Sequence, residues 1–219
     1  MKEKLILSIQ NQLKKLTNKN FSKIYIKKYI FPILEYIALS KNKKFLICGS
    51  QGIGKSTLLA ILEKNLNIFY GIKILTLSLD DYYLKKKERV LLSKKNHPLL
   101  LTRGVPGTHD INMMLDFFKK SKSKKFNKLK LPNFNKAIDD RFPKNKWNKI
   151  NKRPDVIIFE GWCVGARAEP SKTLKKSINS MEKAKDQKLI WRKYVNQQLK
   201  NKYKKLYSQL NCMIYLKAK

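Results

Sequence analysis

The sequence predicts an α/β fold in which helices cover both faces of a mostly parallel sheet. Short apolar segments that look like strands alternate with longer segments whose apolar residues recur at helical spacing. One of the strand-like segments, residues 72–79, is almost continuously apolar, as expected for a strand covered on both faces. No internal repeat or linker divides the 219 residues, so we expect one domain over residues 1–219 with an N-terminal helical segment at 1–40.

The first part of the chain supplies two strands and two helical regions. Residues 1–40 have an amphipathic helical pattern, which is best formed at FPILEYIAL (31–39). The apolar strand KFLICG (44–49) runs into a glycine-rich loop, and STLLAILEKNL (56–66) returns to helical spacing. The second strand is IKILTLSL (72–79).

The remaining elements continue the alternation. We expect helices in YYLKKKERVLLSKK (82–95) and near INMMLDFFKK (111–120), separated by the loop RGVPGTHD (103–110). Residues 119–152 are rich in Lys, Asn and Pro and look irregular. DVIIFEG (155–161) is the third strand, a long helix is expected over residues 182–209, and NCMIYLKA (211–218) is the fourth strand.

Composition excludes several classes of protein. Apolar residues make up 42% of the chain, which is not a disordered composition. No apolar run suggests a membrane span, and MKEKLILSIQNQLKK at the N-terminus does not read as a secretory signal. Cys48, Cys163 and Cys212 are far apart and odd in number, which favours reduced, mostly buried thiols in a cytoplasmic protein. We therefore expect no membrane partner.

The formal net charge of +35 suggests nucleic-acid binding, but the pattern of the charges argues against it. Only 6 of the 50 basic residues are arginines, and the lysines are spread along the chain together with many asparagines and isoleucines. A bias toward A/T-rich codons produces this pattern, whereas a nucleic-acid site is expected to be localised. The safer consequence is that the charge attracts anionic ligands, nucleotides included.

The segment GSQGIGKS (49–56) fits the pattern G-x-x-x-x-G-K-[ST] and is predicted to bind nucleoside triphosphate. Glycines let successive N–H groups face the phosphates, and the following helix adds its positive end. Lys55 is expected to reach the β- and γ-phosphates, and Ser56 to bind Mg²⁺. The nucleotide-binding residues predicted in this loop are Gly49, Ser50, Gln51, Gly52, Ile53, Gly54, Lys55, Ser56 and Thr57.

Carboxylates follow two of the predicted strands. Asp80 and Asp81 end the strand in LSLDDYY, at the sheet edge where open α/β sheets bind ligands. Glu160 ends the strand in IIFEGW, the usual position for a ligand of Mg²⁺-bound water beside a phosphate loop. A kinase needs a base for its acceptor hydroxyl and acids around Mg²⁺, so these residues are candidates for both roles.

Two irregular motifs between these strands carry groups that can bind a small acid. HPLLLTRGVPGTHD (97–110) and LPNFNKAIDDR (131–141) contain Arg103, His109, Lys136 and Arg141. The planar guanidinium suits a carboxylate or a phosphate. A neutral nucleoside would be expected to need aromatic stacking instead.

The residues alone leave three classes of function open. The chain could be a small-molecule kinase, a nucleotide-binding protein with little turnover, or a basic NTPase that acts with nucleic acid. A kinase is expected to form ADP only when its acceptor is added. An NTPase of the third class is expected to be stimulated by RNA or DNA in a salt-sensitive way.

The chain resembles the D-glycerate 3-kinase family, a branch of the P-loop kinases related to uridine kinase, phosphoribulokinase and bacterial pantothenate kinase. The resemblance covers residues 30 to 217. It rests, in order, on GSQGIGKSTL, LSLDDYYL, HPLLLTRGVPGTHD, LPNFNKAIDDR, DVIIFEGWCVGAR and WRKYVNQQL. It implies the P-loop NTPase fold and ATP- and Mg²⁺-dependent phosphorylation of D-glycerate to 3-phosphoglycerate.

The resemblance also implies roles for single residues. Asp80, and not Asp81, is the expected base, with Asp81 among the substrate-binding residues. Glu160 becomes the acid on the Mg²⁺ side and Arg167 a phosphate contact. The candidate clamp for glycerate consists of Arg103, His109, Lys136 and Arg141.

The sequence departs from the family pattern at three places. Asn135 stands where the family usually has aspartate, which removes a charge near the acceptor site, and Tyr82 stands where it usually has phenylalanine. The sequence stops at YLKAK, whereas family members continue with an arginine-bearing helical segment and a stretch that closes over the nucleotide. The C-terminal part of the family domain is therefore expected to be missing.

Overall fold

The computed structural model describes residues 1–123, 128–210 and 212–217 of the chain. The chain divides into two compact units. The first unit comprises Met1–Leu77, Pro154–Trp162 and Leu210–Lys219, and the second comprises Ser78–Arg153 and Cys163–Gln209. Because each unit is built from separate stretches of sequence, no single cut in the chain separates them. That residues 1–219 form a single kinase domain stays a prediction.

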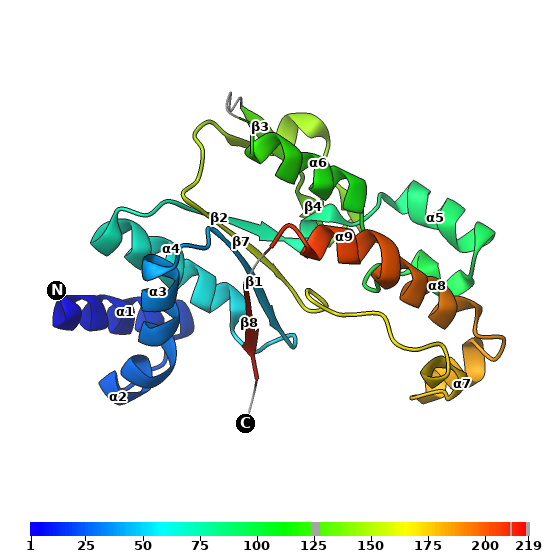
Figure 1. The fold of residues 1–219 in the computed structure, drawn as a ribbon, viewed down its shortest axis with the longest axis horizontal. Helices are drawn as coiled ribbons and strands as arrows, with labels where there is room; N and C mark the ends of the chain where they lie inside the picture. Colours follow the sequence, from blue (N-terminus) through cyan, green and yellow to red (C-terminus); the bar gives the residue numbers. More distant parts are fainter. Residues whose placement is uncertain (124–127, 211, 218–219) are drawn as a thin grey trace. The chain divides into compact units, whose positions relative to one another are not determined.

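The first unit is built around a four-stranded sheet with the order β2-β7-β1-β8 (Figure 1). These strands are Ile74–Ser78, Val156–Gly161, Lys44–Gly49 and Cys212–Leu216. Strand β1 pairs in parallel with both β7 and β8. The predicted α/β fold is confirmed: helices flank a parallel sheet whose strands are distant in sequence. Asn211 and Ala218 of the predicted fourth strand lie outside the described residues.

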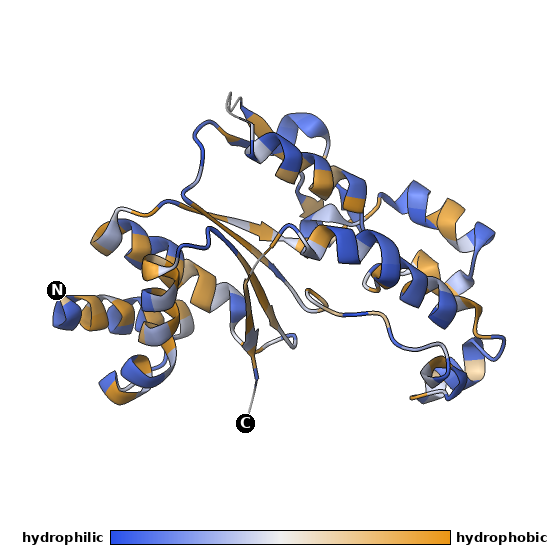
Figure 2. Cartoon of the chain, viewed as in Figure 1, coloured by the Kyte–Doolittle hydropathy of each residue, from blue (hydrophilic) through white to orange (hydrophobic). Residues whose placement is uncertain are grey.

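The core of the first unit lies between the sheet and the helices α1 (Lys2–Thr17), α3 (Phe31–Leu39) and α4 (Lys55–Tyr70). Phe45 and Ile47 of β1 point into this core. The alternate residues Leu46 and Cys48 are also buried, so both faces of β1 are covered, as its continuous apolar sequence predicts. Figure 2 shows β1 and β7 as mostly hydrophobic, whereas α1 is striped.

The second unit combines helices with two short antiparallel ribbons. Helix α6 (Ile111–Ser121) packs against η2 (Leu79–Tyr82) and α9 (Lys204–Tyr207). The ribbons pair β3 with β6 and β4 with β5. The other elements of this unit are α5 (Lys86–Lys95), η3 (Pro98–Leu101), β3 (Leu129–Leu131), β4 (Phe134–Asn135), β5 (Asp140–Arg141), η4 (Lys144–Lys146), β6 (Asn148–Ile150), η5 (Thr173–Lys175), α7 (Ser180–Lys185), α8 (Ile190–Gln198) and η6 (Leu199–Tyr203). The elements α2 (Lys23–Tyr25) and η1 (Ile26–Ile30) belong to the first unit.

Several predicted elements differ from the structure. The predicted N-terminal helix is interrupted after Asn18, which adopts the left-handed conformation (φ 54°) that ends many helices. The predicted helix over 182–209 is broken between α7 and α8, where Leu189 has φ 61°. The region 119–152, predicted to be irregular, contains the two ribbons in its described part. Their strands are too short to give a periodic signal.

The three cysteines form no disulfide: Cys48 and Cys163 are buried and Cys212 is half-buried. This agrees with the prediction of reduced thiols. Among the residues that the structure describes, no helix has the length and apolar character needed to cross a membrane.

Candidate active site

The phosphate loop lies in the first unit, between the end of β1 and the start of α4. Gly52 and Gly54 have φ angles of 77° and 96°, which side-chain-bearing residues rarely adopt. A Cβ atom on Gly49 would lie 2.9 Å from the carbonyl oxygen of Leu216. Glycine is therefore needed at 52 and 54 for the curl of the loop, and at 49 for the close approach of β8.

The Lys55 side chain curls back over this loop. Its Nζ donates to the carbonyl oxygens of Gly49 (2.8 Å) and Ser50 (2.9 Å). Gly54 precedes α4 and has no side chain, so the first N–H groups of this 16-residue helix donate no hydrogen bond to a capping side chain. The ammonium group and the helix start together form a place where phosphate oxygens are favoured.

Glu160 belongs to the same sheet edge as the loop. In the parallel register Ile47 pairs with Glu160 and Cys48 with Gly161, so the carboxyl ends of β1 and β7 are adjacent. Ser56 is exposed in the first turn of α4. A hydroxyl and a carboxylate are oxygen ligands of the type Mg²⁺ takes, together with water and phosphate oxygens. The described residues contain no cluster of three or more His, Cys, Asp or Glu that could hold a metal ion alone.

In the second unit, the loop RGVPGTHD is bound to the segment that follows Asp80 and Asp81. Leu84 N–H donates to the Thr108 carbonyl oxygen (2.9 Å), and Asp110 N–H donates to the Tyr82 carbonyl oxygen (2.7 Å). Tyr83 and His109 form an isolated antiparallel bridge between them. Two motifs that the sequence places about 25 residues apart are thus joined by backbone hydrogen bonds.

Tyr83 connects several of the predicted site residues. Its hydroxyl donates to Asp80 Oδ1 (3.2 Å), and its ring stacks on that of His109 with centroids 4.4 Å apart. Its carbonyl oxygen accepts from Arg141 Nη2 (2.7 Å). The other Asp80 oxygen accepts from Lys136 Nζ (2.8 Å). The structure therefore brings Asp80, His109, Lys136 and Arg141 together around one tyrosine.

His109 is a buried, neutral residue. Burial lowers the pKa of its ring to about 3, against a smaller opposing effect from the Asp80 charge. Nδ1 lies 2.6 Å from the Tyr203 hydroxyl, which accepts from Gly107 N–H (3.0 Å). If the hydroxyl donates to Nδ1, the ring proton is on Nε2, a buried atom without a partner among the described residues. His109 can then donate a hydrogen bond as a neutral ring, and it adds no positive charge to the candidate clamp.

The buried histidine predicts a pH-dependent stability. A group whose pKa is lower in the folded chain contributes stability that is fully present above its unfolded pKa of about 6.5 and is lost as the pH falls toward 3. When the pH is lowered from 7 to 5, we expect His109 to lower the free energy of unfolding by at most about 2 kcal/mol. Urea unfolding at the two pH values measures the loss. His109→Asn should reduce it, and an equal loss in both proteins would contradict the assignment.

Arg103 does not stand alone. It pairs with Asp139 Oδ1, and Arg89 Nη2 lies 2.8 Å from Asp139 Oδ2. Burial alone would raise the pKa of Asp139, but hydrogen bonds from Arg89 and Arg103 outweigh it and lower this pKa. The Arg103 guanidinium also lies over the Phe134 ring, 5.5 Å from its centroid, and its side chain is 29% exposed. Arg103 is thus held in place by Asp139 and Phe134 while part of its side chain stays exposed to solvent.

The remaining predicted residues differ in their surroundings. Asp81 Oδ1 accepts from Phe134 N–H (3.3 Å), which attaches the β4–β5 ribbon to this segment. Arg141 is buried, lies 3.6 Å from Asp110, and its Nε has no partner among the described residues. Arg167 is exposed in the stretch after β7. Its predicted phosphate contact stays a prediction.

Sequence reasoning missed three residues that organise this cluster: Tyr83, Arg89 and Asp139. Arg89 is 1% exposed and donates to the carbonyl oxygens of Leu84 and Leu101. In sequence it lies in a helix rich in Lys, where an arginine is expected to be a surface charge. Asp139 could have been found from its position in IDDR, two residues before the predicted site residue Arg141.

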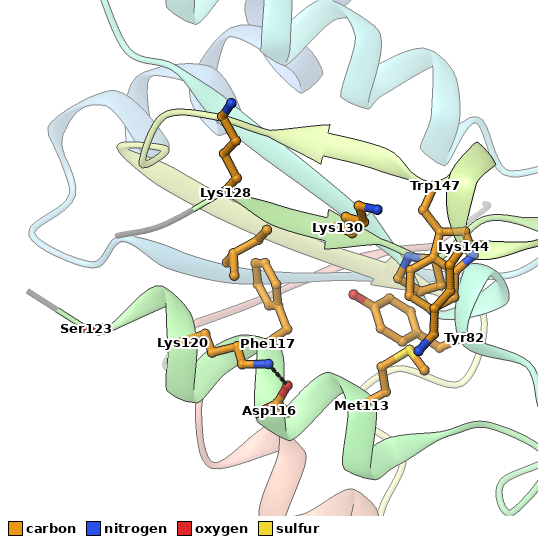
Figure 3. Close-up of a pocket in the computed structure, with 12 residues that line it drawn as sticks. Tyr82, Met113, Asp116, Phe117, Lys120, Ser123, Lys128, Lys130, Lys144 and Trp147 are labelled. Atoms are coloured by element: carbon orange, nitrogen blue, oxygen red, sulfur yellow. Dashed lines mark ion pairs between the residues drawn. The ribbon is translucent and has the colours of Figure 1, made fainter. Parts of the chain in front are cut away.

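A separate pocket of about 570 Å³ lies in the second unit (Figure 3). Tyr82, Phe117 and Trp147 form aromatic parts of its wall, and four lysines surround it. The predicted clamp residues are not among those that line it. Because lysines are frequent over the whole chain, this pocket by itself does not indicate a ligand.

Comparisons with known proteins bear on the fold and the family. No protein-family model matches the chain. An uncharacterized kinase of Schizosaccharomyces pombe is 33% identical over 183 residues, which are 78% of this chain and 63% of that protein. The chloroplastic D-glycerate 3-kinase of Arabidopsis thaliana is 32% identical over 133 residues, 57% of this chain and 29% of that enzyme. The chain thus spans less than two thirds of the length of these relatives.

A solved structure supports the fold assignment. The D-glycerate 3-kinase of Cryptococcus neoformans superposes with a TM-score of 0.67 and 22% identity over 97% of this chain and 71% of that one. This likeness shows the fold alone. The sequence relatives include a D-glycerate 3-kinase, which confirms the predicted resemblance: the chain is similar in sequence to kinases, a D-glycerate 3-kinase among them.

Proposed function

We propose that this protein is an ATP-dependent kinase that phosphorylates D-glycerate to 3-phosphoglycerate. The observation that carries the proposal is the contact between Asp80 and Lys136, at 2.8 Å. It joins the carboxylate that we propose as the base to an exposed cation. A small hydroxy acid offers a hydroxyl to the one and a carboxylate to the other, which a nucleoside does not. The family resemblance supports the same acceptor.

Two buried polar atoms in this cluster lack a hydrogen-bond partner among the described residues. They are His109 Nε2 and Arg141 Nε. Buried polar groups are nearly always paired in folded proteins. Because protein covers both atoms, a bound acid would reach them only after the surrounding side chains move, whereas the partly exposed Arg103 would supply a planar fork for its carboxylate directly. In this assignment Asp81 and Tyr83 position the cluster.

In the proposed reaction, Asp80 accepts the proton of the acceptor hydroxyl. The hydroxyl oxygen forms a bond to the γ-phosphorus, and the bond from that phosphorus to the β–γ bridging oxygen breaks. ADP leaves with the electron pair of that bond. Lys55 and the N–H groups at the start of α4 bind the phosphate oxygens, on which negative charge builds up.

Mg²⁺ fits the residues at the phosphate loop. The Ser56 hydroxyl would bind it directly, and Glu160 through water. When bound, Mg²⁺ would neutralise phosphate charge. Arg167 is assigned as a further phosphate contact.

The proposal is tested by measuring ADP release from Mg²⁺-ATP with a panel of acceptors: D-glycerate, L-glycerate, pantothenate, uridine and none. We expect release that depends on D-glycerate. Equal release with and without an acceptor would contradict the kinase assignment. A signal with pantothenate or uridine alone would keep the kinase and replace the acceptor.

Lys136 provides a sharper test of the acceptor site. Lys136→Met is expected to raise the KM for D-glycerate by about tenfold or more, because a hydrogen bond to a charged group is lost. The KM for ATP should stay unchanged. Steady-state kinetics with each substrate varied in turn measures both values. Lys149→Met, at an exposed lysine of β6, is the matched control, and an equal KM for glycerate in all three proteins would refute the assignment.

A further inference from the structure

A second, larger pocket lies in the first unit, directly beside the phosphate loop. Its volume is about 730 Å³, within the range of small-molecule sites. Gly54 of the loop and Thr57 of α4 belong to its wall. A ligand whose phosphates bind to the loop therefore has this pocket next to it. The full lining is Leu13, Thr17, Phe21, Tyr25, Tyr29, Ile30, Ile33, Ile53, Gly54, Thr57, Leu58, Ile61, Tyr215, Leu216 and Lys217.

One wall of this pocket is a column of aromatic rings. The ring centroids of Phe21 and Tyr25 are 5.2 Å apart, and those of Tyr25 and Tyr29 are 5.0 Å apart. Tyr25 comes directly before the π-helical turn η1 and Tyr29 lies within it, so the two rings come from successive turns of one helical segment. Pro32 follows in the first turn of α3 and has no N–H for an α-helical bond, which favours the wider turn before it.

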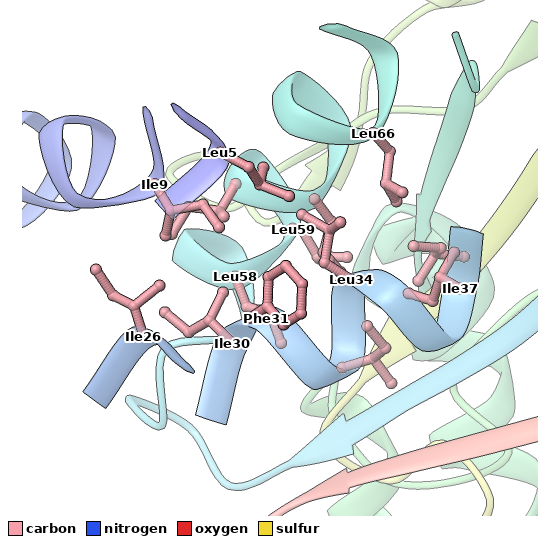
Figure 4. Close-up of a cluster of buried hydrophobic side chains, with 14 of the residues drawn as sticks. Leu5, Ile9, Ile26, Ile30, Phe31, Leu34, Ile37, Leu58, Leu59 and Leu66 are labelled. Atoms are coloured by element: carbon pink, nitrogen blue, oxygen red, sulfur yellow. The ribbon is translucent and has the colours of Figure 1, made fainter. Parts of the chain in front are cut away.

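The aromatic column is fixed by neighbouring side chains of the same segment. Ile26 and Ile30 are buried and point into the core with Phe31, as Figure 4 shows. Tyr25 and Tyr29 remain 41% and 40% exposed. Two tyrosines held exposed on an anchored segment, beside a phosphate loop, are not explained by core packing.

The polar lining of the pocket is sparse. The Thr17 hydroxyl already donates to the Leu13 carbonyl oxygen (2.8 Å) and accepts from Lys19 N–H (3.3 Å). Thr57, Lys217 and the tyrosine hydroxyls are the other polar side-chain groups of the lining. A flat ring can therefore stack here, but few groups are present to read its hydrogen-bonding edge.

We propose that this pocket binds the base and ribose of a purine nucleotide, with the base stacked on Tyr25 and Tyr29. The inference rests on the proposed binding of nucleoside triphosphate by the phosphate loop. It adds that the base stacks on Tyr25 and Tyr29, which precede the motifs of the sequence resemblance, and that adenine and guanine are poorly distinguished. Stacking accepts either purine because both have a π-face.

The test distinguishes binding of the base from binding of the phosphates. Isothermal titration calorimetry with Mg²⁺ compares ATP, GTP and inorganic triphosphate on the wild type, on Tyr25→Ala/Tyr29→Ala, and on Ile24→Ala. Ile24 is 77% exposed and does not line the pocket, so its variant is the control. Circular dichroism checks that all three proteins are folded.

We expect the double variant to bind ATP and GTP about tenfold or more weakly and inorganic triphosphate unchanged. Wild-type Kd values for ATP and GTP should agree within about tenfold. Unchanged ATP binding, or equal weakening of ATP and triphosphate, would overturn the base site and leave the phosphate loop intact. A strong preference for one purine would overturn the stacking mode. A wild type that binds neither ATP nor triphosphate would overturn both proposals.

Discussion

Asp80→Asn is expected to lower kcat by a hundredfold to ten-thousandfold, the usual contribution of a general base. The amide has nearly the shape of the carboxylate and its oxygen can still accept from Lys136 or Tyr83, so the cluster should persist. What is lost is the ability to take the proton of the acceptor hydroxyl. Single-turnover kinetics with saturating ATP and D-glycerate measures the effect, and calorimetry should give an unchanged Kd for ATP.

The neighbouring carboxylate supplies a matched comparison. Asp81 accepts from Phe134 N–H, and asparagine can keep that hydrogen bond. Asp81→Asn is therefore expected to change the KM for D-glycerate more than kcat. If Asp81→Asn loses more kcat than Asp80→Asn, the base has been assigned to the wrong residue. If neither variant loses kcat, the acceptor hydroxyl is not deprotonated by this segment.

The phosphate loop could be predicted because its chemistry is local. Gly49, Lys55 and Ser56 lie within eight residues, and the apolar strand and helix on either side fix where the loop must point. The sheet likewise follows from four apolar segments. The register that puts Glu160 beside Ile47 is not local, but parallel strands leave few alternatives for it.

The acceptor cluster could be predicted only as a set of residue types. The sequence placed Arg103, His109 and Lys136 in irregular motifs, without their partners. The pairing of Arg103 with Asp139 joins residues 36 apart, and that of Lys136 with Asp80 joins residues 56 apart. No periodicity reports such contacts. The neutral state of His109 could not be predicted from the sequence either, because it depends on how deeply the ring is buried and not on residue type.

The break between α7 and α8 shows a polar residue overriding a helical pattern. Residues 186–189 have no glycine or proline, so the sequence predicts a continuous helix. In the structure the Asp186 carboxylate accepts from the N–H groups of Trp191 (2.9 Å) and Arg192 (3.0 Å) at the start of α8. Aspartate competes in this way with the helical backbone bonds. The same carboxylate accepts from Arg192 Nε at 2.9 Å.

Arg192→Leu is expected to lower the free energy of unfolding by about 3 to 5 kcal/mol, because it removes one partner of a buried ion pair. The Asp186 side chain is 0% exposed and that of Arg192 is 5% exposed. Arg192 also donates to the carbonyl oxygens of Leu174 and Asp186, which would lose a donor. Urea unfolding at pH 7 measures the change, with Lys193→Leu as the control at the next, exposed position.

The pH dependence of this loss distinguishes a broken ion pair from lost packing. Burial alone would raise the pKa of Asp186, but hydrogen bonds from Arg192 and Trp191 lower it below its usual value. The stability that Asp186 contributes is therefore present above about pH 4 and is lost as the pH falls through its lower folded pKa. Without Arg192 the buried carboxylate binds a proton more readily. The difference between wild type and Arg192→Leu should then shrink as the pH is lowered from 7 to 4, whereas a constant difference would mean that Arg192 stabilises the fold by packing and neutral hydrogen bonds.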